Sequence, residues 1–256
     1  MGEGFGSVVS AQEPGTLYTF HNLENQRWMK CLQTMKQGAE QAYFDVTFYH
    51  INIDISIHSP YVKGDVLCRV NAAADSVREI KLNLHNALTT DSIAGNVSEY
   101  VFENDTIYIK LDKSYPSGAQ AEVRAYYQGE PQPAAGIAGF QYDVSDGMPK
   151  IVTACEPFFS YCWWPCKDGA GDKADSVYID ITIPDTTIDG TELIALSNGI
   201  LENTLSEGGR KTFQWRERYS IATYYIMVAV SCYSHFQQDY HGRFGEKLQN
   251  RLLGIS

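Results

Sequence analysis

The stretch Tyr49-His50-Ile51-Asn52-Ile53-Asp54-Ile55-Ser56-Ile57-His58 alternates apolar and polar residues over its whole length. Because successive side chains of a β-strand point to opposite faces, this period of two predicts a half-buried strand. Similar patterns, bounded by turn residues, recur at 66–72, 80–84, 107–111, 121–127, 177–183, 193–197, 211–216 and 224–230. No helical pattern separates them, so we predict a mainly β domain of antiparallel, twisted sheets spanning about 43–240.

The segments before and between these strands differ in character. Residues 1–20 are glycine-rich and have no periodicity, which indicates a loose arm. Asn22 is suited to cap a helix that we predict over 23–42, so the arm and the helix form an N-terminal unit of residues 1–42. The stretch 129–164 is rich in proline and glycine and poor in strand signals. Stretches of that length without regular structure are usually functional or form interfaces.

The composition excludes several classes of function. The 256-residue chain is 44% apolar and 20% charged, as is typical of a globular protein with a sizeable core. Its formal net charge of −11 argues against nucleic-acid binding and against docking on an anionic membrane surface. The longest apolar run, near 226–230, is too short to span a bilayer. Residues 1–20 lack the pattern of a signal peptide, and the cellular location is left open.

The segment Thr153–Asp168 concentrates aromatic residues, cysteines and prolines. Irregular segments of this kind are costly to order, which indicates a structural or functional demand. Cys155, Cys162 and Cys166 fit a structural zinc site poorly, because such sites use four ligands in closely spaced pairs. A disulfide is an alternative in an exported protein. Buried free thiols that fill space are the favoured interpretation.

Two further features of this segment have both a functional and a structural interpretation. Trp163 and Trp164 could form a stacking platform for a sugar or a peptide, but packing between sheets, with an indole N–H donating to a carbonyl group, is favoured. Glu156 lies among aromatic residues, where a carboxylate without a partner is unfavourable. It could bind the ammonium group of a substrate. A local salt bridge with Lys167 or Arg124 is the alternative, and the sequence alone favours neither.

Motifs of a catalytic centre are missing from the sequence. Zinc peptidases of the helical type need two histidines four residues apart with a glutamate between them. None of the six histidines forms that pattern, namely His21, His50, His58, His85, His235 and His241. A nucleophile elbow, a phosphate-binding loop and a dinucleotide fingerprint are also missing. The sequence therefore predicts no catalytic residue and no metal ligand in this chain.

Several short motifs follow one another along the chain: Tyr43–Tyr49, Gly139-Phe140, Thr153-x-x-Glu156-Pro157, Trp164–Asp168, Asp172–Ala174, Leu196–Gly199 and Thr223–Ala229. They resemble, in the same order, the patterns Y-D-V-x-x-Y, T-Q-x-E-P, F-P-C-x-D, K-A and L-S-N of one family, together with its last conserved strand pair. Over about 43–235 the chain thus resembles the N-terminal domain of the aminopeptidase N-like zinc metallopeptidases, which are gluzincins.

The resemblance implies a saddle-like β domain, of sandwich type, that packs on a thermolysin-like catalytic domain. The family's zinc motif H-E-x-x-H-x(18)-E lies beyond the end of this chain, so zinc is expected in the full-length enzyme and not here. In the family, the T-Q-x-E-P segment reaches the free amino end of the peptide substrate. The resemblance therefore implies Glu156, Ala154 and Cys155 as substrate-binding residues, with Glu156 facing the ammonium group.

This sequence departs from the family pattern at two places. Ala154 stands where many relatives carry glutamine, which removes a side-chain contact and could alter the preference for the first substrate residue. Residues 241–256 are basic and match no part of the pattern, so we treat them as a separate tail.

The first hypothesis is that the chain is the N-terminal domain of a zinc-dependent aminopeptidase, inactive alone, with its catalytic domain and the amino end of a peptide as partners. Turnover of amino-acid anilides by the purified chain would contradict it. The alternatives are a stand-alone β-sandwich module that binds carbohydrate or protein through Trp163 and Trp164, and a pseudoenzyme remnant that only binds a partner. A domain built to pack on a partner exposes a large apolar face, so we also expect self-association.

Overall fold

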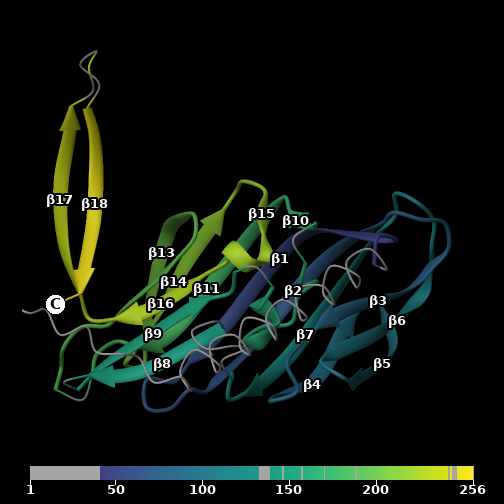
Figure 1. Ribbon diagram of the computed structural model, residues 1–256, viewed down its shortest axis with the longest axis horizontal. Helices are drawn as coiled ribbons and strands as arrows, with labels where there is room; N and C mark the ends of the chain where they lie inside the picture. The colour runs from purple at the N-terminus through teal and green to yellow at the C-terminus, as the bar shows by residue number, and fades with distance from the viewer. Residues whose placement is uncertain are drawn as a thin grey trace, which may run out of the picture.

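A computed structural model describes residues 41–132, 139–145, 147–156, 158–169, 171–187, 189–241, 243 and 247–255, with the backbone alone for 235–241 and 247–255. The predicted helix over 23–42 lies outside the described residues except for Gln41 and Ala42, which form a turn. The prediction of a mainly β structure is confirmed (Figure 1). None of the described helices is long or apolar enough to cross a membrane.

The described residues form strands β1 (Phe44–Ile55), β2 (Val62–Ala72), β3 (Val77–Asn83), β4 (Leu88–Gly95), β5 (Val97–Glu103), β6 (Thr106–Tyr115), β7 (Gln120–Gly129), β8 (Gly139–Ser145), β9 (Met148–Ala154), β10 (Lys173–Ala174), β11 (Ser176–Pro184), β12 (Ile194–Ser197), β13 (Ile200–Glu207), β14 (Arg210–Glu217), β15 (Ile221–Ala222), β16 (Val228–Ser231), β17 (Tyr233–His241) and β18 (Lys247–Ile255). They also form two short 3₁₀ helices, η1 (Ser160–Cys162) and η2 (Thr223–Tyr225).

The largest sheet has seven strands in the order β13-β14-β11-β1-β2-β7-β4. Its central strand β1 carries the alternating stretch that opened the sequence analysis. All neighbours in this sheet are antiparallel except β1 and β11, which are parallel, with Ile51 opposite Ile179. Between β1 and β11 the chain forms the strands β2 to β10, and the described residues of this span form no α-helix, so the parallel pair is not joined by a described crossover helix. This pair is the one departure from the predicted antiparallel arrangement of this sheet.

Smaller sheets complete the body of the molecule. A three-stranded sheet has the order β3-β6-β5, and a four-stranded sheet has the order β12-β16-β9-β8. The hairpin of β8 and β9 corrects the prediction that 129–164 is poor in strands. The predicted strand over 224–230 is also corrected: its first residues form η2, and only Val228–Ser231 form a strand. β17 and β18 pair with each other and project from one end of the body (Figure 1).

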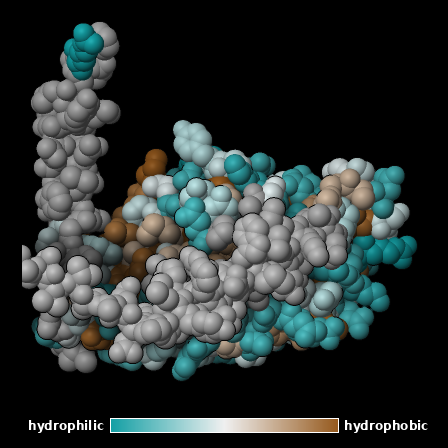
Figure 2. All heavy atoms as spheres, viewed as in Figure 1, coloured by the Kyte–Doolittle hydropathy of each residue, from teal (hydrophilic) through white to brown (hydrophobic). Residues whose placement is uncertain are grey.

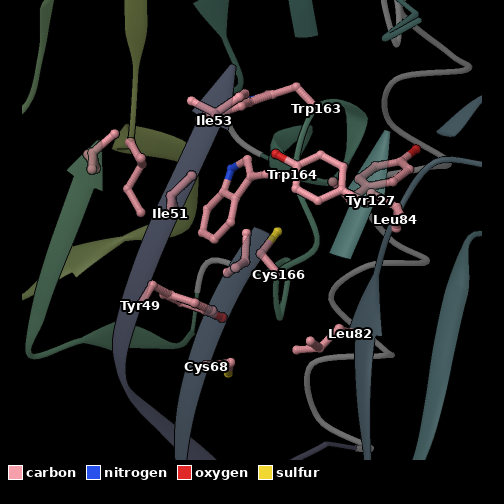
Figure 3. Close-up of a cluster of buried hydrophobic side chains, with 14 of the residues drawn as sticks. Tyr49, Ile51, Ile53, Cys68, Leu82, Leu84, Tyr127, Trp163, Trp164 and Cys166 are labelled. Carbon is pink, nitrogen blue, oxygen red and sulfur yellow. The ribbon is translucent and has the colours of Figure 1, made fainter. Parts of the chain in front are cut away.

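The core lies beneath the seven-stranded sheet and is formed by the inward residues of β1 and its neighbours. Trp163 and Trp164, which follow η1, are fully buried in this core. Figure 3 shows the Trp164 indole beside Ile51 of β1 and Cys166. Its ring packs edge-on against Tyr49, with ring centroids 4.9 Å apart. The aromatic segment between β9 and β10 therefore packs under the sheet and fills part of the core.

The opposite face of the seven-stranded sheet is polar and is crossed by ion pairs. Asp180 of β11 accepts hydrogen bonds from His50 of β1 at 3.0 Å and from Arg216 of β14 at 2.6 Å. Burial raises the pKa of the Asp180 carboxyl, but the hydrogen bonds from His50 and Arg216 outweigh burial and hold that pKa below its usual value. Asp180 thus links three adjacent strands of the sheet through its charged form.

Lowering the pH is expected to reduce the free energy of unfolding, because the Asp180 carboxylate becomes protonated. A carboxyl with a lowered folded-state pKa contributes stability above its unfolded pKa, and this contribution is lost as the pH falls through the folded pKa. At pH 6 we expect the Asp180→Asn variant to be less stable than the wild type by about 1–2 kcal/mol, and at pH 2 we expect the difference to shrink. Urea unfolding at both pH values measures this, and a difference independent of pH would contradict it.

Candidate functional site

The candidate site lies where β9 ends. β9 pairs with β16, with Val152 opposite Ala229, and the Val228 N–H donates to Oγ1 of Thr153 at 2.9 Å. The strand alternation buries Thr153 and leaves Val152 exposed. Continuing the same alternation past the end of the strand buries Cys155 and exposes Ala154 and Glu156. The Glu156 carboxylate is therefore presented on the outer face of the sheet.

Glu156 is a neighbour of Tyr225 in η2. β9 pairs with β16 at Ile151 and Val152, and η2 comes shortly before β16, so the end of β9 lies beside the turn that carries Tyr225. The side chain of Tyr225 is 55% exposed, and its ring centroid lies 4.4 Å from that of Tyr224. A hydrogen bond with Tyr224, the charge of that phenol and the charge of Glu156 raise the pKa of Tyr225, and the nearby Lys173 opposes this rise. A carboxylate and a tyrosine thus lie side by side on the exposed face.

The cations proposed as salt-bridge partners of Glu156 are engaged elsewhere. Nζ of Lys167 lies 2.8 Å from Oδ2 of Asp172 and donates to the Phe44 carbonyl at 2.6 Å, and Arg124 pairs with Asp65. In the described part of the chain, Glu156 has no ion pair. The structure therefore removes both named partners of the structural interpretation.

The segment Trp164–Asp168 anchors the site to the body. The N–H of Cys166 donates to the Asn83 carbonyl at 3.1 Å, and the N–H of Asn83 donates to the Cys166 carbonyl at 2.6 Å, which ties the segment to the end of β3. Asp168 accepts a hydrogen bond from the Thr223 hydroxyl at 3.4 Å, at the first residue of η2. A motif far from Tyr225 in the sequence thus helps to fix the turn that carries it.

The Leu196–Gly199 motif holds the same turn from the other side. The Ser197 hydroxyl donates to the Met227 carbonyl at 2.6 Å, and Oδ1 of Asn198 accepts from the Met227 N–H at 2.7 Å. Lys173 of β10 pairs with Ala222 of β15, directly before η2. The family-like motifs therefore converge on the surface around Glu156. The sequence analysis missed Tyr225, Lys173 and Met227 as members of this surface, since only the pairing of β9 with β16 and of β10 with β15 brings their segments together.

The three cysteines of the aromatic segment are buried and form no disulfide with one another, as the favoured interpretation predicted. Burial raises the pKa of the Cys155 thiol to about 12, so this group is neutral at physiological pH. Cys155 was expected among the substrate-binding residues, but its side chain faces the core and only its backbone borders the site. Among the described residues, no group of three or more histidine, cysteine or acidic side chains could hold a metal ion. We therefore assign zinc to no described residue of this chain.

The tryptophan pair is not a surface platform. Trp163 and Trp164 are fully buried, and among the described residues neither indole nitrogen donates to a carbonyl group, which corrects that detail of the packing interpretation. A separate cavity of about 410 Å³ lies at the other end of β9, lined by residues that include Tyr142 and Pro149. The Tyr142 hydroxyl donates to the Ile57 carbonyl at 3.1 Å in that region. Glu156 does not border this cavity.

Comparison with known proteins supports the motif pattern. The Peptidase M1 N-terminal domain family matches residues 46–225. No curated protein matches the chain.

Solved structures share the fold. A mutant of the M1 zinc metallopeptidase from Deinococcus radiodurans is 20% identical, with a TM-score of 0.72 over 84% of this chain and 48% of that chain. The unmutated M1 zinc metallopeptidase from Deinococcus radiodurans is also 20% identical, with a TM-score of 0.70 over 82% of this chain and 47% of that chain. A third structure, the mutant bound to a Tyr-Ser-Ala substrate, gives 20% identity and a TM-score of 0.70 over 82% of this chain and 48% of that chain. The chain thus spans about half the length of the solved proteins it matches.

Proposed function

Because the chain belongs to the Peptidase M1 N-terminal domain family, we propose that it recognises the free amino end of peptides for a zinc-dependent aminopeptidase. In this proposal Glu156 binds the substrate ammonium group, and the exposed face of the domain docks on a catalytic domain. The chain alone is expected to hydrolyse nothing. When bound in the catalytic domain, zinc would supply the Lewis-acid and water-activating chemistry of peptide hydrolysis.

The observation that carries the proposal is the exposed Glu156 without an ion pair in the described part of the chain. A carboxylate at the end of a rigid strand is a strong acceptor for an N⁺–H donor, and such charge-assisted hydrogen bonds are about twice as strong as neutral ones. The charge of Glu156 acts on the Tyr225 phenol, and the Tyr225 ring packs against that of Tyr224. The solved relative with a bound Tyr-Ser-Ala substrate shows that a protein of this fold binds a peptide.

Replacing Glu156 with glutamine is expected to weaken recognition of the amine. The purified chain should bind phenylalaninamide at low salt, and Glu156→Gln should weaken this binding about tenfold, because the ammonium group loses the negative charge of its hydrogen-bond acceptor. Chemical shifts in an NMR titration measure the affinity. N-acetyl-phenylalaninamide, which has no ammonium group, should not bind to either protein.

A matched control distinguishes a specific effect of Glu156 on binding from a general effect of the net charge of the protein. Glu103 on β5 is also exposed and forms no ion pair with a described residue, so Glu103→Gln changes the net charge equally at another sheet. This variant should bind phenylalaninamide as the wild type does. Equal weakening by both variants would show that only the net charge matters and would contradict the proposed site.

The exposed apolar residues of β13 are expected to make the isolated chain self-associate. In the described part of the chain, β13 is an edge strand of the seven-stranded sheet and exposes Ile200 (67%), Leu201 (40%) and Leu205 (51%). Figure 2 shows hydrophobic residues gathered over this region. An apolar edge strand with open backbone groups favours pairing with another chain.

Leu205→Lys should therefore shift the chain toward the monomer at concentrations where the wild type forms larger species. Light scattering across a concentration series measures the molar mass. Val101→Lys on β5 introduces the same charge at another exposed apolar residue and should leave self-association unchanged. A wild-type chain that remains monomeric at every concentration would contradict the prediction.

The alternative of a binding module that uses Trp163 and Trp164 is not supported. Stacking on a sugar or a peptide needs an accessible ring face, and both rings are fully buried. Exposing them would require the core beneath β1 to open.

A further inference from the structure

The cavity of about 410 Å³ lies between three segments that are far apart in the sequence. Its lining comes from the residues that follow β1, from the β8–β9 hairpin and from the loop that follows β11. The Tyr142 hydroxyl donates to the Ile57 carbonyl at 3.1 Å, which ties the hairpin to the segment after β1. The volume is in the range of the sites that bind small organic molecules in proteins.

Most of the named lining is apolar. Ile57 and Pro149 are buried and Val144 is exposed, and all three line the cavity together with Tyr142. Because the Tyr142 hydroxyl is already bound to the Ile57 carbonyl, these four residues offer mainly hydrocarbon surface. Apolar surface of this kind favours a ligand with a hydrocarbon body, which it removes from water.

A carboxylate completes the lining on the side of the loop after β11. The Thr187 hydroxyl and the Thr191 N–H, the latter at 3.3 Å, both donate to Oδ1 of Asp189. These hydrogen bonds, that from Thr187 first, hold the pKa of the Asp189 carboxyl below its usual value, so the group is negatively charged at neutral pH. Since both bonds go to Oδ1, Oδ2 is the oxygen that can accept from a ligand.

The charge around the cavity favours a cation. Among the described residues that line it there is no lysine or arginine, and Asp189 is the acidic one. His58 also lines the cavity and offers an imidazole nitrogen for a second hydrogen bond. The formal net charge of −11 of the whole chain adds a field that attracts positive ligands.

From this cavity we propose a second ligand site, which binds small arylalkylammonium ions. The ammonium group donates to Oδ2 of Asp189, and the aromatic body lies against Ile57, Val144 and Pro149. The site lies at the opposite end of β9 from Glu156, which is not among its lining residues. The proposal therefore stands independently of the proposed recognition of peptide amino ends.

The test is an NMR titration of the whole 256-residue chain with 2-phenylethylamine. The amide signals of Ile57 and Gly147, which line the cavity, should shift and saturate. Asp189→Asn should weaken this binding about tenfold, because the ligand loses its charged acceptor. The asparagine keeps Oδ1 as the acceptor for Thr187 and Thr191, so the loop should be retained. The neutral analogue 2-phenylethanol should bind at least about tenfold more weakly than the amine.

Two further variants separate the cavity from the net charge. Val144→Phe fills part of the space from an exposed position and should weaken binding about fivefold or more, since the ligand and the new ring compete for it. Asp143→Asn is the matched control. Oδ1 of Asp143 accepts from the Val144 N–H at 2.9 Å, and Asp143 is not among the lining residues, so this variant removes an equal charge nearby and should bind as the wild type does.

The outcomes separate this site from the surface around Glu156. Glu156→Gln should leave the shifts of Ile57 and Gly147 unchanged, while the signals of Glu156 and Tyr225 report the other surface. Shifts confined to those two residues, or equal weakening by Asp189→Asn and Asp143→Asn, would overturn the proposal. If Asp189→Asn has lost the amide dispersion of a folded protein, Val144→Phe decides, and unchanged binding in that variant overturns the site.

Discussion

The Trp164→Ala variant is expected to lose about 3–5 kcal/mol of unfolding free energy, which is a large part of the stability of a typical domain. The indole is fully buried between β1 and the segment that follows η1, and it contacts the rings of Tyr49 and Trp163 at centroid distances of 4.9 and 5.7 Å. Removing it leaves a cavity that the surrounding strands can fill only in part.

Urea unfolding followed by circular dichroism measures the loss. Trp164→Phe should cost much less than Trp164→Ala, because it keeps an aromatic ring and removes an indole nitrogen that has no hydrogen-bond partner. Tyr219, which is 83% exposed, provides the control, since Tyr219→Ala should change stability by less than about 0.5 kcal/mol. A Trp164→Ala variant as stable as Tyr219→Ala would contradict the role of Trp164 in the core.

Lys167→Ala is the second variant with a large expected effect. Its Nζ is buried, pairs with Asp172 at 2.8 Å, donates to the Phe44 carbonyl at 2.6 Å and lies 4.4 Å from the centre of the Phe44 ring. Removing one partner of a buried ion pair leaves an uncompensated charge, which costs about 3–5 kcal/mol. Asp45 adds to this cost. Burial and then the neighbouring Asp172 raise the pKa of Asp45, whereas Lys167 lowers it, so removing Lys167 takes away the charge that favours the ionised carboxylate.

The loss of unfolding free energy in Lys167→Ala should depend on pH. The folded-state pKa of Asp45 is already raised, and without the lysine it rises further, so the folded state binds more protons and regains stability as the pH falls toward 4. Urea unfolding at pH 7.5 and pH 4.5 measures the recovery. The double variant Lys167→Met with Asp172→Asn removes both charges and should recover part of the stability at pH 7.5.

An exposed pair serves as the matched control. Lys110 and Glu99 lie 3.4 Å apart and are both 65% exposed, so Lys110→Ala should cost less than about 1 kcal/mol at either pH. A loss in Lys167→Ala no larger than this, or independent of pH, would show that the buried cation does not stabilise the segment.

The strands with a clean period of two were predictable from the sequence. β1, β2, β7 and β11 each bury one face and expose the other to solvent, and this burial produces the alternation. The sequence did not predict β13 for the opposite reason. All residues of this strand are exposed, so burial does not produce an alternation of apolar and polar residues. β9 was missed because Pro149 lies within it, and proline normally argues against a strand.

The candidate site was predictable only in part. The sequence motif singled out Glu156, but whether it was free or engaged depended on where Lys167 and Arg124 pointed, and those cations pair with Asp172 and Asp65. Tyr225 could not be associated with Glu156 from the sequence, because η2 interrupts the apolar run and the two residues meet only through the pairing of β9 with β16.

The parallel pairing of β1 with β11 has a consequence for the synthesis of the chain. β1 can pair with β2 as soon as both have left the ribosome, but its other edge has to wait for residues 176–184, which are made much later. During that interval the central strand of the future sheet offers open backbone groups and isoleucine side chains to other nascent chains. A chaperone that shields this edge would therefore raise the yield of folded protein most when translation is slow.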